Sequence, residues 1–388
     1  MKKKILVFSG SRADYGLLKK VIIKLRLKKN IKLITVIGGQ HISPLFGNTY
    51  REIINDKIKI NYICPHKIKS TEEKEIINNI SKSLVYFNAV LKKSKPDLIL
   101  LLGDRYEVYS FALSAFLMGF YIAHIHGGEI TQGAFDDSLR HSITKFSNLH
   151  FVSHKKYKKR IIQLGENPKN IYIVGSLGCE NARTVKFKSK KQLFSSYNIP
   201  LKKKKILITH HPETKSKLNY NDQIKNILIA IKMLKNTHFI ITYPNSDTKG
   251  KKFIREIENF KRKNPRNTTL IKSMGAKLYL NFLKHVDLIL GNSSSGIIES
   301  PTLKTPTVNI GERQSGREFS KSIFTCGNEK LQIYKTIQKT INSKNKIIFD
   351  DIYYKNNTSK QIVKIITKLI YKKNFEKNYN KKFYDIKI

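Results

Sequence analysis

The sequence predicts an α/β protein made of two doubly wound domains, each a parallel sheet covered by helices. Short apolar runs alternate with longer helical patterns along all 388 residues. Several of these runs are apolar throughout, which is typical of strands buried on both faces of a parallel sheet. The alternation starts again after a polar, Lys-rich break at about residues 181–205, and a hydrophobic content of 40% can fill two cores.

These patterns predict a first domain at residues 1–180, a second at 181–370 and a basic tail at 371–388. The strands expected in the first domain are Ile5–Phe8, Ile31–Ile37, Ile58–Ile63, Leu98–Leu102, Tyr121–Ile125, Leu149–Val152 and Ile171–Val174. The helices expected between them include Tyr15–Leu25, Thr71–Leu91, Tyr106–Leu117 and Ser138–Phe146. Alternating strands and helices indicate right-handed βαβ units.

The second half repeats this pattern. Its expected strands are Ile206–Thr209, Phe239–Tyr243, Thr269–Ile271, Leu288–Leu290 and Thr307–Ile310, and its expected helices are Asp222–Leu234, Phe253–Arg262 and Lys277–Lys284. A further helix is expected to begin near Ser359 and to precede the basic tail. Doubly wound sheets bind ligands at the carboxyl ends of their strands, so two facing domains predict an active site in the interdomain cleft.

The formal charge of +46 admits two interpretations. One is binding to nucleic acid, and the other is a solvated, Lys-rich surface that also attracts an anionic substrate. The lysines are spread along the whole chain and no nucleic-acid recognition motif accompanies them, so the second interpretation is favoured. Weak, salt-sensitive binding would still follow from charge alone.

Cysteine usage and hydropathy indicate a cytoplasmic protein without a membrane segment. Cys64, Cys179 and Cys326 lie far apart in the sequence, which fits free thiols in a reducing compartment. The apolar run at Ile5–Phe8 is too short for a signal peptide, and Phe111–Ile125 is too short and too interrupted to span a bilayer.

Polar motifs follow the expected strands of the first domain. Ser9-Gly10-Ser11-Arg12 opens a helix, where backbone N–H groups and a guanidinium can bind an anion. Gly103-Asp104-Arg105 and His126-Gly127-Gly128-Glu129 each end a strand, and Asp136-Asp137 begins the next helix. Asp104, Glu129 and Asp136 could therefore converge as a carboxylate cluster, while the alternative assigns the last of these to helix capping. The two glycines of the second motif would let the backbone approach a ligand closely.

The second domain offers a matching set at its strand ends. His210-His211 follows the first strand, without the further ligands that a metal site requires. Asn292-Ser293-Ser294-Ser295-Gly296 opens a helix that carries Glu299, and its hydroxyls and N–H groups suit a diphosphate. Glu299 could bind a ribose diol, and Arg313 could reach the same nucleotide. The alternative for the serine block is a simple helix cap.

Taken together, these segments resemble the UDP-N-acetylglucosamine 2-epimerase family, and its hydrolysing branch above all. The resemblance covers roughly residues 5–320, in the family's order. The matching segments are GSRADYG, GNTY, LGDRYE, HIHGGE, FDDSLRHSITK, VGSLG, HHPET, GNSSSG and GERQSGRE. It implies two Rossmann-like domains of the glycosyltransferase-B type, and a protein that is usually a homo-oligomer.

The resemblance also implies residue roles. Asp104, Glu129 and Asp136 are similar to the family's catalytic acids, His211 to the histidine that supports the diphosphate leaving group, and Glu180 more weakly to another acid. The implied substrate-binding residues are Arg12, Arg105, Ser293, Ser294, Ser295, Gly296, Glu299 and Arg313. Residues near Gln40–Phe46 and Thr131–Phe135 are candidates for reading the sugar substituents.

The implied reaction converts UDP-N-acetylglucosamine into UDP and N-acetylmannosamine, by elimination to 2-acetamidoglucal and then hydration. It requires no metal and no redox cofactor. Within the family, the substrate could instead be a 2,4-diacetamido-2,4,6-trideoxy sugar nucleotide of the legionaminic acid pathway, or the enzyme could be non-hydrolysing. A glycosyltransferase of the same fold remains the rival enzyme, since fold does not determine chemistry.

Overall fold

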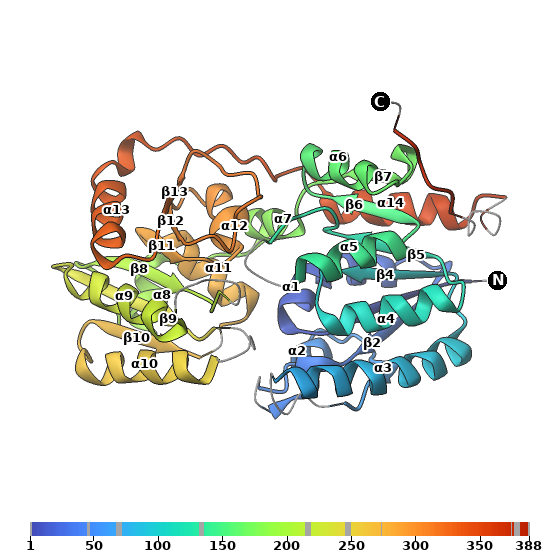
Figure 1. Cartoon of the computed structure of the whole chain (residues 1–388), viewed down its shortest axis with the longest axis horizontal. Helices are drawn as coiled ribbons and strands as arrows, with labels where there is room; N and C mark the ends of the chain where they lie inside the picture. Colours follow the sequence, from blue (N-terminus) through green and yellow to red (C-terminus); the bar gives the residue numbers. More distant parts are fainter. Residues whose placement is uncertain are drawn as a thin grey trace. The chain divides into compact units, whose positions relative to one another are not determined.

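The computed structural model describes residues 2–44, 47–66, 72–131, 136–213, 219–244, 250–272, 274–373, 375 and 381–386. The chain forms two compact units, each built on its own parallel sheet (Figure 1). Unit 1 takes in the described parts of Met1–Glu129, Phe135–Glu180 and Tyr353–Ile388, and unit 2 takes in those of Ile130–Ala134 and Asn181–Ile352. The prediction of two doubly wound α/β domains is confirmed.

The sheet of unit 1 is parallel throughout its described strands and has the order β3-β2-β1-β4-β5-β6-β7. Its strands are β1 (Lys3–Ser9), β2 (Ile31–Ile37), β3 (Tyr62–Ile63), β4 (Leu98–Leu102), β5 (Ile122–Ile125), β6 (Leu149–Val152) and β7 (Ile171–Ile173). The strand order reverses between β1 and β4, so the loops that follow these two strands flank the switch point.

Helices cover both faces of this sheet. They are α1 (Arg12–Arg26), α2 (Tyr50–Asn55), α3 (Glu73–Ser94), α4 (Tyr106–Leu117), α5 (Asp136–Phe146), α6 (Lys155–Gln163), α7 (Leu177–Thr184), which crosses into unit 2, and α14 (Thr358–Ile370), with 3-10 turns η1 (Gly39–Ile42) and η3 (Pro168–Asn170). Alternate residues of β1 enter two different cores: Ile5 packs with α1 and α14, and Leu6 with α3 and α4. This alternation explains why the strands are apolar without a break.

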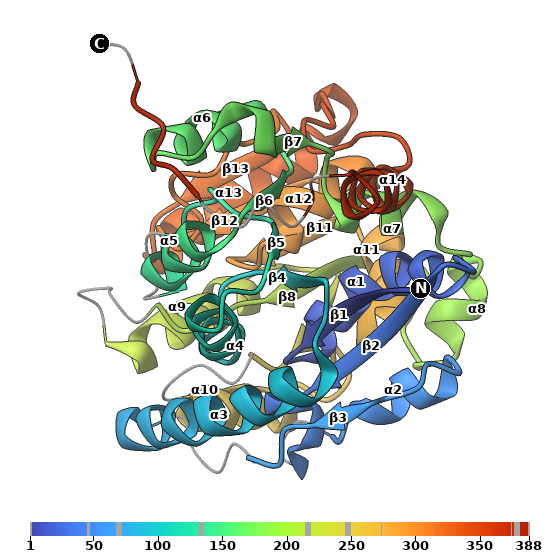
Figure 2. The same ribbon diagram turned by 90° about the vertical axis from the view of Figure 1, so that its right-hand side faces the viewer.

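The C-terminal helix corrects the predicted domain boundaries. Residues 353–370, assigned to the second domain from the sequence, and the described residues of the 371–388 tail belong to unit 1. The reason is packing: α14 lies beside α1, and Ile362, Val363 and Ile366 are buried in the core that α1 forms on the sheet (Figure 2).

The sheet of unit 2 is also parallel in its described strands and has the order β10-β9-β8-β11-β12-β13. Its strands are β8 (Lys204–Thr209), β9 (Thr237–Thr242), β10 (Thr268–Ile271), β11 (Leu288–Gly291), β12 (Thr307–Ile310) and β13 (Ile323–Cys326). Here the order reverses between β8 and β11, and the loops after these strands flank the second switch point.

Unit 2 has helices on both faces of its sheet. They are α8 (Lys190–Ser195), α9 (Tyr220–Lys232), α10 (Gly250–Lys263), α11 (Gly275–His285), α12 (Ser295–Thr302) and α13 (Lys330–Asn342), with the 3-10 turn η4 (Lys344–Lys346). Residues 181–205 are therefore more than the polar break expected from the sequence: α8 begins with a capping box at Ser189, and Leu193 and Phe194 are buried against α11.

Several predicted elements begin or end a few residues from their observed bounds. The largest difference is at the strand predicted at 58–63, which is regular only at Tyr62–Ile63. Of the helix predicted at 71–91, the first residue, Thr71, lies outside the described residues, and α3 runs over Glu73–Ser94. In the described part of the chain, no helix is long and apolar enough to cross a membrane.

Candidate active site

In unit 1, two of the predicted acids meet around one arginine. The Arg140 guanidinium, on the second turn of α5, pairs through Nη2 with Oδ2 of Asp104, and its Nη1 lies 3.5 Å from Oε2 of Glu129. Ser153 Oγ donates to the other oxygen of Glu129 at 3.1 Å. Asp104 follows β4 and Glu129 follows β5, so neighbouring strand ends bring these carboxylates together.

The third predicted acid, Asp136, is the first residue of α5 and is partly buried. Its charge acts on Arg105. Burial alone would lower the pKa of Arg105, but neighbouring carboxylates, among them Glu107 and Asp136, outweigh burial and raise it. Asp136 thus lies within electrostatic reach of the loop that follows β4.

The two predicted arginines of unit 1 lie at the switch point. Arg12 is the first residue of α1, directly after Ser11, whose Oγ accepts from Asp14 N at 3.2 Å and caps the helix. Arg105 is engaged within unit 1, since Nε and Nη2 contact Glu107 at 3.3 and 3.4 Å. Its role as a substrate ligand stays a prediction.

The glycines of the HIHGGE segment serve packing within unit 1. Gly128 has φ +73°, and a Cβ at this position would lie 2.7 Å from the Tyr157 carbonyl oxygen on α6. Gly128 therefore lets the backbone pack closely on α6, and the expected close approach to a ligand stays a prediction. His126 precedes these glycines with a positive φ of 65°, and its Nδ1 lies 3.9 Å from Oε1 of Glu129.

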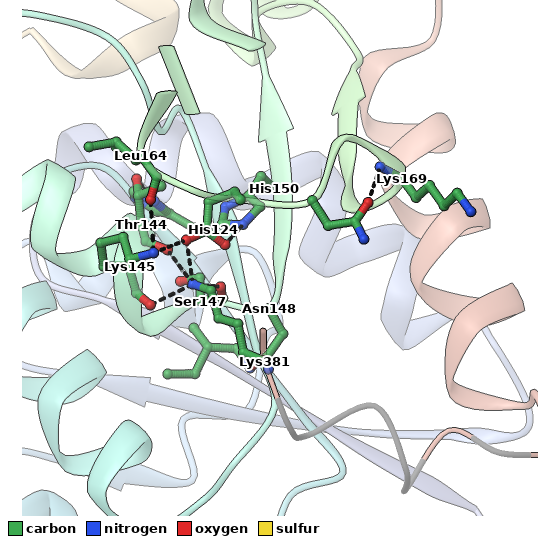
Figure 3. Close-up of polar contacts among 12 residues, drawn as sticks. His124, Thr144, Lys145, Ser147, Asn148, His150, Leu164, Lys169 and Lys381 are labelled. Carbon is green, nitrogen blue, oxygen red and sulfur yellow. Dashed lines mark hydrogen bonds and ion pairs between the residues drawn. The ribbon is translucent and has the colours of Figure 1, made fainter. Parts of the chain in front are cut away.

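A histidine that the sequence analysis passed over supports the Asp104 loop. Burial lowers the pKa of His124, on β5, to about 3, so its ring is neutral. Nε2 lies 2.8 Å from the Gly103 carbonyl oxygen and must carry the proton, while Nδ1 lies 3.2 Å from Thr144 Oγ1 and accepts. Figure 3 shows His124 beside Thr144 at the last turns of α5. The ring therefore joins the loop before Asp104 to α5.

In unit 2, the side chain of Asn292 joins the loops after β8 and β11. Its Oδ1 accepts from the backbone N–H of His211 at 2.7 Å, and its Nδ2 donates to the His211 carbonyl at 2.9 Å and to Glu213 Oε1 at 3.4 Å. Burial, with the charge of Arg313 second, holds the pKa of His211 well below its ordinary value. His211 therefore has a neutral ring on a backbone that Asn292 holds at the switch point.

The loop after β12 belongs to the same network. Backbone N of Arg313 donates to Glu213 Oε1 at 3.2 Å, its Nη1 donates to the Asn292 carbonyl at 3.4 Å, and Gln314 Nε2 donates to that carbonyl at 2.8 Å. Gly311, at φ +75°, has no room for a side chain, because a Cβ would lie 2.3 Å from Glu213 Oε1. Arg313 is thus brought next to the serine turn.

The serine turn itself is internally bonded. Ser293 and Ser295 hydroxyls lie 3.0 Å apart, and Ser295 Oγ lies 2.6 Å from Tyr279 OH. Ser294 is the N-cap residue of α12 without a side-chain cap bond. At Gly296 a Cβ would lie 2.9 Å from Thr307 Cγ2, so this glycine lets α12 pack on β12.

The remaining candidates lie as follows. Glu299 is on α12, partly buried. Glu180 accepts from the backbone N and the Oγ of Ser359, both at 2.9 Å, and so caps α14 as a structural group. Of Gln40–Phe46 and Thr131–Phe135, residues 45–46 and 132–135 lie outside the described residues.

Among the described residues, no three His, Cys, Asp or Glu side chains are grouped as metal ligands would be.

Comparison with known proteins agrees with the resemblance. The family model described as UDP-N-acetylglucosamine 2-epimerase matches residues 23–367. A GDP/UDP-N,N'-diacetylbacillosamine 2-epimerase (hydrolyzing) from Campylobacter jejuni is 39% identical over 83% of this chain and 84% of its own length. Polysialic acid biosynthesis protein P7 of Escherichia coli is 38% identical over 99% and 98%. A UDP-N,N'-diacetylbacillosamine 2-epimerase (hydrolyzing) from Legionella pneumophila is 32% identical over 94% and 96%.

Solved structures share the fold. A UDP-GlcNAc 2-epimerase from Neisseria meningitidis, bound to UDP-GlcNAc, has a TM-score of 0.79 at 20% identity and covers 94% of this chain and 100% of its own. The S. aureus MnaA–UDP structure has a TM-score of 0.74 at 18% identity and covers 99% and 100%. The fold is therefore of the glycosyltransferase-B type, as the resemblance implied. The chain belongs to the UDP-N-acetylglucosamine 2-epimerase family, a family of enzymes, and groups with its hydrolysing branch.

Proposed function

We propose that this chain hydrolyses a UDP-linked 2-acetamido sugar with inversion at C2, and that UDP-N-acetylglucosamine is its substrate. The observation that carries the proposal is the pairing of Asp104 and Glu129 around Arg140 at the ends of neighbouring strands. Two fixed carboxylates at neighbouring strand ends, one of them in a loop that flanks the switch point, suit proton transfer to and from a sugar carbon. The matches to named 2-epimerases support the reaction class.

Each unit carries residues suited to one part of the proposed substrate. The diphosphate would bind at the serine turn of unit 2, with His211 and Arg313, because N–H groups at a helix start and a guanidinium stabilise the charge that grows on UDP as it leaves. The sugar would face Asp104, Glu129 and Asp136 of unit 1. In this assignment, Arg12, Arg105 and Glu299 bind the substrate's polar groups.

The chemistry follows from the acidity of the C2 proton. That proton has no carbonyl beside it, so the anomeric C–O bond breaks first and leaves an oxocarbenium-like sugar. A carboxylate stabilises this cation and takes the C2 proton, giving 2-acetamidoglucal and UDP. Water then adds to C1, while a carboxyl group returns a proton to C2 from the opposite face. The sum is nucleotide sugar and water in, UDP and N-acetylmannosamine out.

The comparisons also support a second candidate substrate. Relatives 39% and 32% identical to this chain are named as diacetylbacillosamine 2-epimerases, whereas one named as UDP-N-acetylglucosamine 2-epimerase, from Neisseria meningitidis, is 27% identical. The alternative substrate is therefore a UDP-linked 2,4-diacetamido-2,4,6-trideoxy sugar, turned over by the same steps.

One experiment tests the reaction and the substrate together. The protein is incubated in deuterated water with UDP-N-acetylglucosamine, UDP-diacetylbacillosamine and UDP-glucose, and NMR identifies the products. Release of UDP with a C2-deuterated, C2-inverted free sugar is expected. A nucleotide-bound product would identify a non-hydrolysing epimerase, and UDP release only with an added acceptor would identify a glycosyltransferase. Size-exclusion chromatography with light scattering tests the predicted homo-oligomer.

The acid assignment has a matched control. Asp104→Asn and Glu129→Gln are each expected to lower kcat by ~10²-fold or more, the usual scale for general acid–base loss. Asp97 precedes the same strand that Asp104 follows, and it accepts from Lys4 N at 2.7 Å, away from the switch point. Asp97→Asn should leave kcat within about twofold. Near-normal activity in both acid variants would refute the assignment.

A further inference from the structure

Arg140 is a buried charge to which the proposed reaction assigns no role. Its side chain is 5% exposed, and it contacts Oδ2 of Asp104 and, at 3.5 Å, Oε2 of Glu129. A buried guanidinium loses its hydration, and this loss is unfavourable unless charged partners offset it. The two carboxylates are such partners, which indicates an electrostatic role for Arg140.

Anchoring α5 does not require that charge. Ile143, three residues on, is buried in the core that α3 and α4 form on the sheet. Thr144 is bonded to His124 at 3.2 Å, and Lys145 donates to the Leu164 carbonyl at 2.8 Å. These contacts hold the helix in place without the guanidinium, so the charge of Arg140 can be assigned a role toward the two carboxylates.

The carboxylates, in turn, need a shared cation. Two acids that converge repel each other, and one of them then keeps its proton near neutral pH. A guanidinium presents five N–H groups in a planar fork and can contact two carboxylates at once, which a single ammonium does less well. We propose that Arg140 is a positioning residue for the reaction: it holds Asp104 and Glu129 ionised together and at a fixed separation. This inference rests on the proposed function.

Other charged and titratable groups lie on the elements that carry the pair and on the elements next to them, and their states bear on its titration. They are His124 on β5, His126 with its Nδ1 3.9 Å from Glu129 Oε1, Arg160 on α6, Asp136, Asp137 and His141 on α5, and Arg105 and Glu107 after β4. Burial lowers the pKa of His124 to about 3 and lowers that of His141, so neither ring supplies positive charge at neutral pH. Among the ion pairs of the described residues, Arg140 is the cation that contacts both acids.

The first test reads the two carboxyl groups directly, without turnover. Carbon-detected NMR titrations of Asp104 and Glu129 are compared in the whole protein, in Arg140→Gln and in Arg140→Lys. The neutral variant should raise the titration midpoints by about one pH unit or more, and the Lys variant by less, because its charge remains. Arg26→Gln, which removes an exposed charge at the end of α1, should change neither midpoint. Unmoved midpoints in Arg140→Gln overturn the proposal.

The second test connects the pair to the reaction. The acidic limb of kcat/KM against pH should move upward by the same amount in Arg140→Gln, with a partial return in Arg140→Lys. If the midpoints move while the limb does not, Arg140 controls the acids but the acids do not serve the reaction, and the proposed function fails instead. Should Arg140→Gln not fold, Asp104→Asn gives the reverse test: Arg140 then shares its charge with one acid fewer, so the Glu129 midpoint should fall. A Glu129 midpoint that does not fall overturns the proposal.

Discussion

Replacing Asn292 by alanine tests whether one side chain sets the geometry of the nucleotide side of unit 2. Asn292 is fully buried, and its amide makes paired bonds of 2.7 and 2.9 Å to the backbone N–H and C=O of His211. Alanine leaves both backbone groups without these partners in a buried place. Each unsatisfied group costs about 1–3 kcal/mol, so we expect the unfolding free energy to fall by roughly 3 kcal/mol.

Asn281 provides a matched control in the same unit. It is buried on α11, and its amide also bonds two backbone groups, Lys188 N and Lys277 O, both at 2.8 Å. Lys188 and Lys277 are exposed, so water can replace both lost bonds, and Asn281→Ala should lower stability by less, about 1 kcal/mol. Both variants lose paired bonds from an amide to the backbone, and only Asn292→Ala loses the pair that holds the His211 backbone.

The assays separate stability from site geometry. The chain has no tryptophan, so urea unfolding is followed by circular dichroism, and UDP binding by calorimetry. We expect Asn292→Ala to weaken UDP binding by about tenfold or more, which corresponds to about 1.4 kcal/mol, and Asn281→Ala to change it less than about twofold. Equal losses of UDP affinity in both variants, or unchanged affinity in Asn292→Ala, would refute the reasoning.

Three further predictions follow from buried contacts. Gly311→Ala puts a Cβ 2.3 Å from Glu213 Oε1 at φ +75°. The free energy of unfolding in urea should therefore fall by about 1–3 kcal/mol, and an unchanged midpoint would contradict this. Lys381→Met removes an ammonium 2.7 Å from buried Glu166, which Lys145 still contacts at 2.8 Å, so the free energy of unfolding should fall by about 1–3 kcal/mol; an unchanged urea midpoint would contradict this. The pKa of His124 is about 3 when folded, so the unfolded chain takes up the proton first and stability falls as pH drops below 6.5. His124→Gln should lose less stability than the wild type between pH 7 and 5.5.

Much of the fold could be predicted because buried parallel strands carry an unbroken apolar signal. β2, β4, β6 and β12 have the predicted bounds. β13 was not predicted, because Ile323–Cys326 is an edge strand whose middle residues are partly exposed and whose apolar pattern is weak. The packing of α14 on unit 1 is a tertiary choice: an amphipathic pattern marks a helix, but it does not say which of two sheets the helix covers.

The site was predicted only where residues stand in motifs at strand ends. Asp104, Glu129 and His211 follow strands directly, and that position is visible in the sequence. Arg140 and Asn292 lie inside the quoted motifs, but their partners come from other loops, 36 and 81 residues away. The spacing of Arg140 four residues after Asp136 was a usable signal, since such residues share a helix face.

Helix α5 connects the candidate active site to the C-terminal segment that carries no motif. Asp136, Arg140 and Thr144 follow at intervals of four and lie on one face of the helix. At the other end of α5, the Lys381 ammonium donates to the carbonyls of Thr144 and Ser147 at 3.4 and 2.8 Å (Figure 3). A positive charge there stabilises the C-terminus of the helix. Lys381 therefore holds the C-terminal end of α5, the helix whose Arg140 contacts the acids. We expect a chain shortened before Lys381 to lose activity along with stability, although it keeps every motif residue, and unchanged kcat in the shortened chain would contradict this.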